Sequence, residues 1–396
     1  MNLDVLIFGG GAAGLWLLDE LNRRSFRVLL IERRALGAGQ TIASQGILHG
    51  GLKYMLGGIV SGSARAAGEM TDVWRGCLGG GGRPDLREVR ILSPHCHLWR
   101  TDSITSRAAL SAAGFVLRTS VEKVTAQDRP AALAHCPGEV LRVEEQVVDA
   151  ASFLQVLSRA HSTRIVKAGE DNGVEFVTSG PGCVDEVRLR GANTGRAVSL
   201  RPTTCIFAAG EGNEGLRHSV GLSGDIMQRR ALHTVMIRGR LPQLFGHCVD
   251  GNKTRVTITS ADDSRGLTVW QVGGEVAEKG VDMTPSDLVQ FTRRELVSVL
   301  PGVDLAGTEW GTYRISRAEG RSKSGLRPDG PVWRREGSVV SAWPTKLVLV
   351  PRLARLIADA LGDPPAGHET SVESPPDWPR PEVALPPWEV CDEWRS

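Results

Sequence analysis

The chain lacks the features that mark several classes of protein. Its 396 residues hold 47 Lys and Arg against 45 Asp and Glu, so the formal net charge is only +2. A nucleic acid is not expected as the main partner, because such binding depends on concentrated positive charge that releases counterions from phosphates. No stretch approaches 18 consecutive apolar residues, so no transmembrane segment is predicted. We expect a cytoplasmic protein, and attachment to a membrane surface stays open.

Closely spaced cysteine pairs are also missing. The seven cysteines are scattered, with no Cys-x-x-Cys motif and no preceding signal peptide, which indicates reduced thiols in a cytosolic protein. The one cluster of ligand-type side chains is His95-Cys96-His97. Because no further ligands follow at the spacing of a zinc site, we expect an ordinary loop or strand there and no bound metal.

Glycine, by contrast, is abundant. The chain has 47 glycines in 396 residues, well above the usual share of about 7%. This composition implies many positions with positive φ or with close approach of the backbone to a ligand. At roughly 150 residues per domain, the length predicts two to three structural units with room for a sizeable core.

The first 32 residues follow the pattern of a dinucleotide-binding βαβ unit. An apolar strand is predicted at residues 3–8, a helix at 12–21 and a second buried strand at 28–31. Residues 9–14 read Gly-Gly-Gly-Ala-Ala-Gly, which matches G-x-G-x-x-G between strand and helix, where that motif is expected. Together these parts predict a nucleotide whose phosphates lie at the helix N-terminus.

Four residues of this unit have predicted roles. Gly9 permits the tight turn, Gly11 lets the backbone approach a pyrophosphate, and Gly14 lets the helix pack against the strand. Glu32 ends the second strand and is placed to accept hydrogen bonds from a ribose hydroxyl.

The identity of the dinucleotide depends on residues further along. Arg33 and Arg34, directly after the acid, are placed to reach the 2′-phosphate of NADP. Two later segments favour FAD instead. Residues 37–54 form a loop rich in glycine, small and hydroxyl residues, and residues 205–210 run as an apolar strand into Ala-Ala-Gly. Such segments allow a large flat cofactor to lie close to the backbone.

These segments resemble the FAD-dependent oxidoreductases of the D-amino-acid oxidase, FAD-linked glycerol-3-phosphate dehydrogenase and L-2-hydroxyglutarate oxidase type. Residues 47–54, Ile-Leu-His-Gly-Gly-Leu-Lys-Tyr, look like the His-Gly-Gly-Leu-Arg-Tyr stretch of the glycerol-phosphate enzymes, with Lys53 in place of arginine. Residues 148–160 resemble the family's return to the cofactor domain, and residues 208–210 resemble its late flavin-contacting turn.

The C-terminal third carries the rest of the resemblance. Residues 326–330 and 343–350 resemble the family's closing segment, which meets the flavin ring from the far side. The glycerol-phosphate enzymes have Gly-Gly-Lys there, whereas this chain has Pro344-Thr345-Lys346. The resemblance therefore indicates the cofactor more strongly than the substrate.

The resemblance implies an α/β fold with a discontinuous Rossmann-like FAD-binding domain and a second, α+β substrate domain built on a mainly antiparallel sheet. The expected ranges are 1–70, 149–225 and 331–362 for the FAD-binding domain, and 71–148 and 226–330 for the substrate domain. Residues 363–396 are rich in proline and tryptophan and are predicted to form an extended tail laid over the chain's own domain. Docking of a partner through this tail is the alternative.

The resemblance further implies where FAD is bound. Contacts are expected from the glycine-rich turn, the end of the second strand, the small-residue loop, the late turn and the closing segment. The expected cofactor-binding residues are Gly9, Gly11, Ala12, Ala13, Gly14, Glu32, Arg33, Thr41, Ser44, Gln45, Gly46, Ala209, Gly210 and Lys346.

Three residues are catalytic candidates. An alcohol substrate needs a group that removes its hydroxyl proton, and His49 in the matching glycine-flanked loop suits that role. The hydroxyl of Tyr54 can bind a carboxylate, and Lys346 can stabilise negative charge on the reduced flavin or hold an anion. The alternatives are a packing role for the tyrosine and a solvated position for the lysine.

Substrate binding is predicted from Lys53, from Tyr313 and from an arginine. The family places an arginine near Tyr313 that forks onto a substrate carboxylate or phosphate. Its position relative to the closing segment favours Arg314, whereas the Arg-Pro dipeptide favours Arg327. The sequence leaves both open.

The predicted function is an FAD-dependent oxidoreductase that oxidises a small anionic alcohol by hydride transfer to flavin N5. A 2-hydroxy acid or a glycerol-3-phosphate-like compound is the expected substrate. The alternatives are a flavin-dependent amine or amino-acid oxidase and a non-catalytic flavoprotein of an assembly. The electron acceptor, whether oxygen, a quinone or a protein, is open, as are the oligomeric state and covalent attachment of the flavin.

Overall fold

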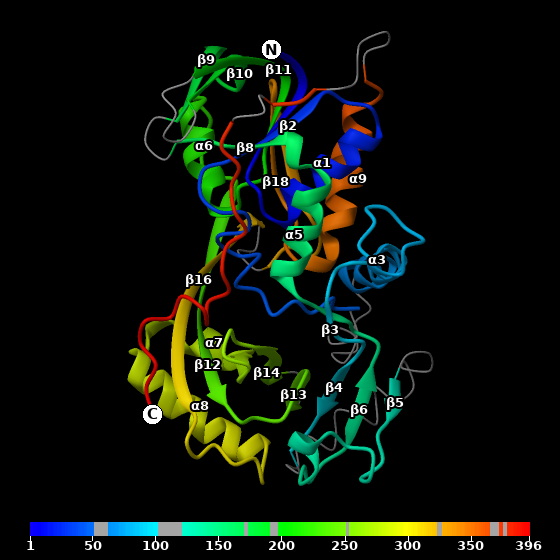
Figure 1. Ribbon diagram of the computed structural model, residues 1–396, viewed down its shortest axis with the longest axis vertical. Helices are drawn as coiled ribbons and strands as arrows, with labels where there is room; N and C mark the ends of the chain where they lie inside the picture. The colour runs from blue at the N-terminus through cyan, green and yellow to red at the C-terminus, as the bar shows by residue number, and fades with distance from the viewer. Residues whose placement is uncertain are drawn as a thin grey trace.

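The structure is a computed structural model that describes residues 1–50, 62–101, 121–169, 173–190, 197–250, 253–322, 327–364, 372–374 and 378–396. The predicted site residues Lys53 and Tyr54 lie outside these ranges. Figure 1 shows one sheet in the upper half of the molecule and a second sheet in the lower half.

The first sheet is built around parallel strands, in the order β17-β18-β11-β1-β2-β8. Parallel pairing joins β1 to β11 and β2, β11 to β18, and β2 to β8, whereas β17 and the β9–β10 hairpin pair antiparallel. The strands are β1 (Asn2–Phe8), β2 (Val28–Glu32), β8 (Ile165–Lys167), β9 (Val174–Gly180), β10 (Cys183–Arg190), β11 (Ala197–Phe207), β17 (Val332–Glu336) and β18 (Val339–Trp343).

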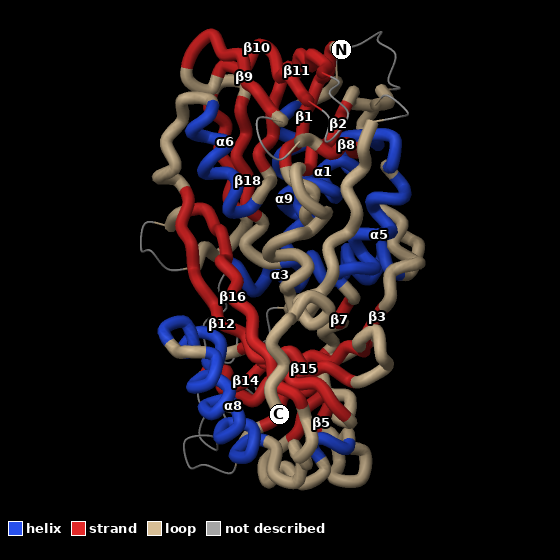
Figure 2. Tube along the Cα trace, turned by 60° about the vertical axis from the view of Figure 1, so that its left-hand side comes forward, coloured by secondary structure: helices blue, strands red, loops and turns tan. Residues whose placement is uncertain are grey.

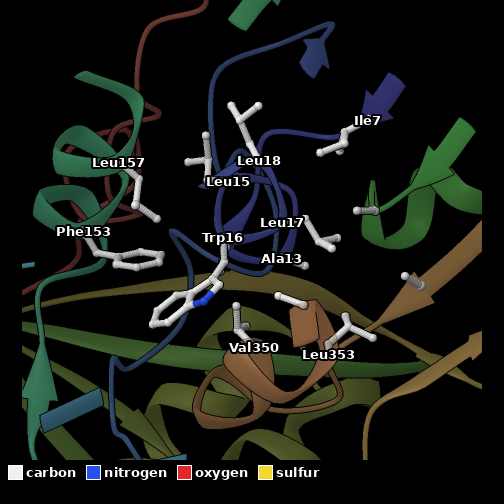
Figure 3. Close-up of a cluster of buried hydrophobic side chains, with 14 of the residues drawn as sticks. Ile7, Ala13, Leu15, Trp16, Leu17, Leu18, Phe153, Leu157, Val350 and Leu353 are labelled. Atoms are coloured by element: carbon white, nitrogen blue, oxygen red, sulfur yellow. The ribbon is translucent and has the colours of Figure 1, made fainter. Parts of the chain in front are cut away.

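Both faces of this sheet are covered, which is why its central strands are almost continuously apolar. Val5 and Ile7 of β1 face a helical layer, whereas Leu6 and Phe8 face the β9–β10 hairpin. In the helical layer, Trp16 of α1 packs on Phe153 of α5 with ring centroids 6.2 Å apart (Figure 3). The helices on that side are α1 (Ala12–Arg23), α3 (Gly62–Leu78), α5 (Ala150–Ala160) and α9 (Val350–Leu361).

The second sheet has the order β16-β12-β15-β14-β13-β4-β6-β5 and is antiparallel except where β13 pairs with β4. Its strands are β4 (Cys96–Trp99), β5 (Val121–Lys123), β6 (Val140–Val143), β12 (Met227–Gly239), β13 (Gly246–Asp250), β14 (Lys253–Asp262), β15 (Thr268–Gly273) and β16 (Glu309–Gly320). Leu288 and Leu296 of α8 pack on its buried side chains. The predicted fold class is confirmed.

Smaller elements lie beside and between the two sheets. The strands β3 (Ile91–Ser93) and β7 (Val147–Val148) pair with each other beside the return to the first sheet. The remaining helices are α6 (Asn213–Ser219), α7 (Glu275–Lys279), α8 (Pro285–Val299) and the 3₁₀ turns η1 (Ala131–Leu133), η2 (Ser162–Arg164), η3 (Gly210–Gly212), η4 (Gly280–Asp282) and η5 (Leu347–Leu349). Among the described residues, no helix has the length and apolar character needed to span a membrane.

The strands β12 and β16 form a long ribbon that runs between the two halves of the molecule (Figures 1 and 2). Their register pairs Met227 with Gly320 at one end and Arg238 with Glu309 at the other. Side chains alternate along each strand, so residues two apart share one face of the ribbon. This ribbon brings the second sheet to the edge of the first.

The described part of the C-terminal tail is extended and packs on the chain's own surface. Trp378 is buried, and its Nε1–H donates to the carbonyl oxygen of Lys167 at 3.1 Å. Further on, the Arg238 guanidinium lies 3.9 Å from the centre of the Trp394 ring. The tail therefore contacts β8 in the first sheet and β12 in the second, as Figure 1 also shows. Docking of a partner through it stays a prediction.

Candidate active site

A cavity of about 800 Å³ lies between the carboxyl ends of β1 and β11 and the β12–β16 ribbon. The carboxyl ends of parallel strands are where open α/β sheets bind ligands, and this volume is in the upper part of the range for such pockets. The predicted residues that line it are Gly9, Gly11, Ala12, Ala13, Glu32, Arg33, Thr41, Ser44, Gln45, Gly46, His49, Ala209, Gly210, Tyr313, Arg327 and Lys346. Gly14 and Arg314 do not line it.

The glycine-rich turn has the geometry that its sequence predicts. Gly9 has φ of +107°, and a Cβ there would lie 2.5 Å from the Cα of Ala209. A Cβ on Gly14 would lie 1.9 Å from the carbonyl oxygen of Gly9, so only glycine lets the helix pack this closely. At Gly11 a Cβ would meet only the Thr41 hydroxyl, at 3.2 Å. Gly11 is thus open to the cavity, where a pyrophosphate would approach.

Glu32 closes the turn at the end of β2. Its carboxylate accepts hydrogen bonds from the N–H groups of Gly10 at 2.7 Å, Arg33 at 2.8 Å and Arg34 at 2.9 Å. Two carboxylate oxygens offer about four acceptor positions, so Glu32 retains capacity for a ribose hydroxyl. Thr41 contributes from the following loop, where its Oγ1 accepts the N–H of Ala12 in the first turn of α1 at 3.1 Å.

The hydroxyl of Ser44 indicates that the cavity holds a ligand. Its hydroxyl oxygen is buried and has no hydrogen-bond partner within the described residues, although Ser44 lines the cavity. A buried hydroxyl without a partner is costly, so such groups in native proteins usually have a partner in the complete assembly. A ligand in the cavity would supply one.

Gln45 and Tyr313 fasten the loop to the second sheet. The Gln45 side-chain amide donates to the carbonyl oxygens of Thr257 and Gln271, each at 3.0 Å. The Tyr313 hydroxyl donates to the carbonyl of Ala43 at 3.0 Å and accepts from the Gln271 side chain at 2.9 Å. Burial raises the pKa of Tyr313 to about 12, so this donor stays protonated. Both side chains line the cavity, but their polar groups are used to hold the loop.

The closing segment after β18 has an unusual backbone. Thr345 has φ of +67°, a left-handed conformation that costs a threonine on the order of 1–3 kcal/mol. Two hydrogen bonds hold it: its hydroxyl donates to Gly330 O at 2.8 Å, and its carbonyl accepts from the Arg327 guanidinium at 3.0 Å. The result is that Lys346, only 6% exposed, lies in the cavity wall just before η5 and α9.

His49 is held by a residue that the sequence did not indicate. Its Nδ1 lies 3.3 Å from Oε2 of Glu145, and the N–H of Gly50 donates to Oε1 at 2.8 Å. Nε2 of His247 lies 3.7 Å from the same Oε2. Burial alone would raise the pKa of Glu145, but the charge of His49, its hydrogen bond and the nearby His247 hold that pKa well below its usual range. The carboxylate is therefore ionised.

On β16, the arginine that faces the cavity is Arg317 and not Arg314. Along β16, Tyr313 and Arg317 face the cavity, whereas Arg314 faces the other side and donates to the carbonyls of Val281 at 2.6 Å and Met283 at 3.0 Å. Alternation of side chains in a strand separates the two arginines. The same alternation, counted from Tyr313, would have indicated Arg317 from the sequence, whereas no local signal marks Glu145.

Arg317 lies among positive charges. It stands directly opposite Arg230 in the ribbon, and like charges opposite each other destabilise a strand pair. The buried Glu319 carboxylate lies 3.7 Å from Arg230 and 3.8 Å from Arg327. Arg317 itself makes no hydrogen bond or ion pair with any described residue. Burial, together with the charges of Arg327 and Arg230, lowers its pKa to about 10, which still leaves the guanidinium charged at neutral pH.

A parallel sheet with a glycine turn at its carboxyl edge, roofed by an antiparallel sheet across a shared cavity, is the architecture of an FAD-dependent oxidoreductase. The chain belongs to this family: the model of the FAD dependent oxidoreductase (DAO) family matches residues 4–360. The cofactor is thus FAD, and the NADP alternative based on Arg33 and Arg34 is discarded. The open approach at Gly11, the acceptor Glu32 and the unpartnered Ser44 hydroxyl fit this cofactor.

One relative matches over nearly the whole chain. The probable FAD-dependent oxidoreductase PA4991 of Pseudomonas aeruginosa is 37% identical over 403 aligned residues, which cover 99% of this chain and 98% of that protein. Its crystal structure has a TM-score of 0.82 to this structure, with 34% identity, and 98% of each chain is covered.

More distant solved structures share the fold. Glycine oxidase from Geobacillus kaustophilus has a TM-score of 0.63 at 17% identity and covers 93% of this chain and 96% of its own. The L-alpha-glycerophosphate oxidase from Mycoplasma pneumoniae, with FAD bound, has a TM-score of 0.62 at 14% identity and covers 98% and 99%.

Proposed function

We propose that this FAD-dependent oxidoreductase oxidises a small anionic alcohol, either a 2-hydroxy acid or a glycerol-phosphate-like compound. The observation that carries the proposal is that one cavity is lined both by His49, whose ring is held by an ionised carboxylate, and by the charged Arg317. A base serves the hydroxyl group, and an arginine serves the anionic group.

The anionic group is assigned to Arg317. Arg230, opposite Arg317, lies 3.6 Å from Glu278 and 3.7 Å from Glu319, whereas Arg317 forms no ion pair with a described residue, so a bound anion would be the counter-charge of Arg317. A carboxylate or phosphate matches the planar fork of arginine with two parallel hydrogen bonds. Arg327 supports the same site indirectly, because it holds the carbonyl of Thr345 and so the position of Lys346. Lys53 and Tyr54 keep their predicted roles as further substrate-binding and catalytic residues.

The hydroxyl group is assigned to His49. Bound FAD accepts two electrons as hydride at N5 and so supplies the oxidant. For an alcohol, the O–H proton must also leave, and an imidazole whose Nδ1 faces a carboxylate can take it at Nε2. A neutral amine presents its own lone pair and needs no strong base, so the histidine favours the alcohol over the amine. Lys346 in the cavity wall supplies a positive charge for the negative charge that develops during the reaction.

The comparisons support both substrate classes at the level of the fold, since one structural relative is named for glycine and another for glycerophosphate.

The test is therefore a matched substrate screen. Purified protein is mixed anaerobically with 2-hydroxy acids, glycerol 3-phosphate and the amino acids of equal carbon skeleton, and loss of the oxidised-flavin absorbance is followed. We expect bleaching by an alcohol. Bleaching by an amino acid alone, unchanged in a His49→Asn variant, would establish an amine oxidase instead.

A further inference from the structure

A buried carboxylate, that of Glu145, lies beside His49. Glu145 follows β6 and precedes β7, and its side chain is 4% exposed. Three groups from two other segments converge on it: the imidazole of His49, the N–H of Gly50 and the imidazole of His247 on β13. His49 and Glu145 are 96 residues apart in the sequence, so only the fold brings them together.

We infer that Glu145 is a positioning residue for the base: its carboxylate orients the ring of His49, keeps the proton of the neutral imidazole on Nδ1 and stabilises the imidazolium that forms during the reaction. Nε2 of His247 lies 3.7 Å from the same carboxylate oxygen that faces His49, and Nδ1 of His247 is 2.8 Å from the hydroxyl of Thr257. The inference rests on the proposed function, because it gives His49 a proton to accept.

The negative charge of Glu145 at this position indicates an electrostatic role. A buried charge costs several kcal/mol unless it is paired, and no Lys or Arg side chain among the described residues forms an ion pair with Glu145. A neutral glutamine could accept the same N–H of Gly50 and the same hydrogen bond from His49. What the glutamine lacks is negative charge, which is the property that favours an imidazolium 3.3 Å away.

The proposed step moves one proton from the substrate hydroxyl to His49. Nδ1 of His49 keeps its own proton and donates it to Glu145 throughout. When the substrate O–H bond breaks, its proton bonds to Nε2 of His49, and the ring becomes an imidazolium beside the carboxylate. Glu145 remains unprotonated and returns to its starting state when His49 releases the proton.

The groups that face Glu145 decide how the site responds to pH. Apart from the two histidines, the titratable side chain beside it is the thiol of Cys96 on β4. Burial, with the charge of Glu145, raises the pKa of that thiol well above its usual value, so Cys96 stays neutral. Among the described residues, the other titratable side chains that face Glu145 are His49 and His247.

The experiment compares Glu145→Gln with Glu144→Gln in the FAD-loaded protein. Glu144 precedes Glu145 in the sequence and is exposed, with its carboxylate 3.5 Å from Arg75. Glu144→Gln therefore makes the same chemical change at a position that does not contact His49. Histidine side chains labelled with ¹³C and ¹⁵N are titrated by NMR, and His49 is identified by its absence from His49→Asn. We expect Glu145→Gln to lower the pKa of His49 by about 1 unit or more, since an opposite charge at this distance has that effect. Glu144→Gln is expected to leave it unchanged.

The kinetic counterpart uses the substrate from the anaerobic screen. Glu145→Gln should slow flavin reduction at saturating substrate roughly 10- to 100-fold and move its pH profile to lower pH, with the apparent Kd unchanged. Equal pKa values and equal rates in the two variants would overturn the inference. The NMR arm needs no substrate, so a protein that no alcohol reduces refutes the proposed function and still leaves the His49 titration to decide on Glu145.

The parent protein provides a second measurement that is independent of any variant. The ¹⁵N shifts of neutral His49 report which ring nitrogen carries the proton. We expect the Nδ1–H form. A dominant Nε2–H form would overturn the inference even if the substituted proteins failed to fold.

Discussion

Arg317 offers the sharpest test of the proposed anion site. Its guanidinium is charged, desolvated and without a partner among the described residues, so a bound carboxylate or phosphate would be its counter-charge. Removing one partner of such a desolvated pair costs about 2 to 5 kcal/mol. At 1.4 kcal/mol for each tenfold change, Arg317→Ala should weaken apparent substrate affinity by at least ~30-fold and by up to a few thousandfold. The affinity is read from the substrate dependence of anaerobic flavin reduction.

Arg314→Ala is the matched control. Arg314 lies on the same strand, three residues nearer its start, but its guanidinium bonds to the carbonyls of Val281 and Met283 outside the cavity. Substrate affinity in Arg314→Ala should stay within two- to threefold of the parent. Arg317→Lys should recover only part of the loss, because lysine keeps the charge but not the fork.

Stability gives an independent check on the same residue. Without substrate, Arg317→Ala removes one member of the like-charge pair with Arg230, so its thermal midpoint should equal or exceed that of the parent. Saturating substrate should raise the midpoint of the parent and not of the variant. Small and equal effects of Arg314→Ala and Arg317→Ala on affinity would refute the anion site.

Three further predictions concern the cofactor, the base and the tail. Gly11→Val should abolish FAD retention, measured by flavin absorbance after gel filtration, because a branched side chain would fill the open approach beside Thr41; stoichiometric flavin would contradict this placement. His49→Asn should slow flavin reduction by about 10² to 10⁴ with FAD still bound, and the parent rate should rise with pH through the pKa of His49, which the Glu145 carboxylate is expected to hold above the ~6.5 of a free imidazole; a pH-independent rate and a variant within a few fold of the parent would remove His49 from the reaction. Trp378→Ala should lower the free energy of unfolding in urea by about 3 to 5 kcal/mol, whereas Leu385→Ala, at a position 61% exposed, should change it by less than about 0.5 kcal/mol; equal losses would show that the tail does not pack as described.

The cofactor part of the site could be predicted from the sequence because its determinants are local. Gly9 must tolerate φ of +107°, and Gly14 must leave room for the carbonyl of Gly9 five residues earlier. Both demands arise within a single strand–turn–helix unit, so a short motif expresses them completely. Glu32 belongs to the same unit, since it ends the strand beside that turn and accepts the N–H of Gly10.

The assignment of polar side chains needed the tertiary structure. Gln45 and Tyr313 stand in segments that resemble the family's site, yet their hydrogen bonds hold the loop to β14 and β15. The residue type tells how many hydrogen bonds a side chain can donate and accept, but only the fold decides which partners form them. Arg314 and Arg317 are equally charged in the sequence, and only the face of β16 on which each lies separates them.

The role of Glu145 could not be predicted from the sequence. Nothing in its neighbourhood distinguishes it from Glu144, which is exposed and beside Arg75. The sequence by itself determined the cofactor turn, because chain-local sterics and apolar periodicity dictate it, and its resemblance to a known family indicated FAD and the fold class. Only the tertiary structure showed which residues surround His49, because Glu145 and His247 are about 100 and 200 positions away, and proximity across such separations exists only once the two sheets have packed.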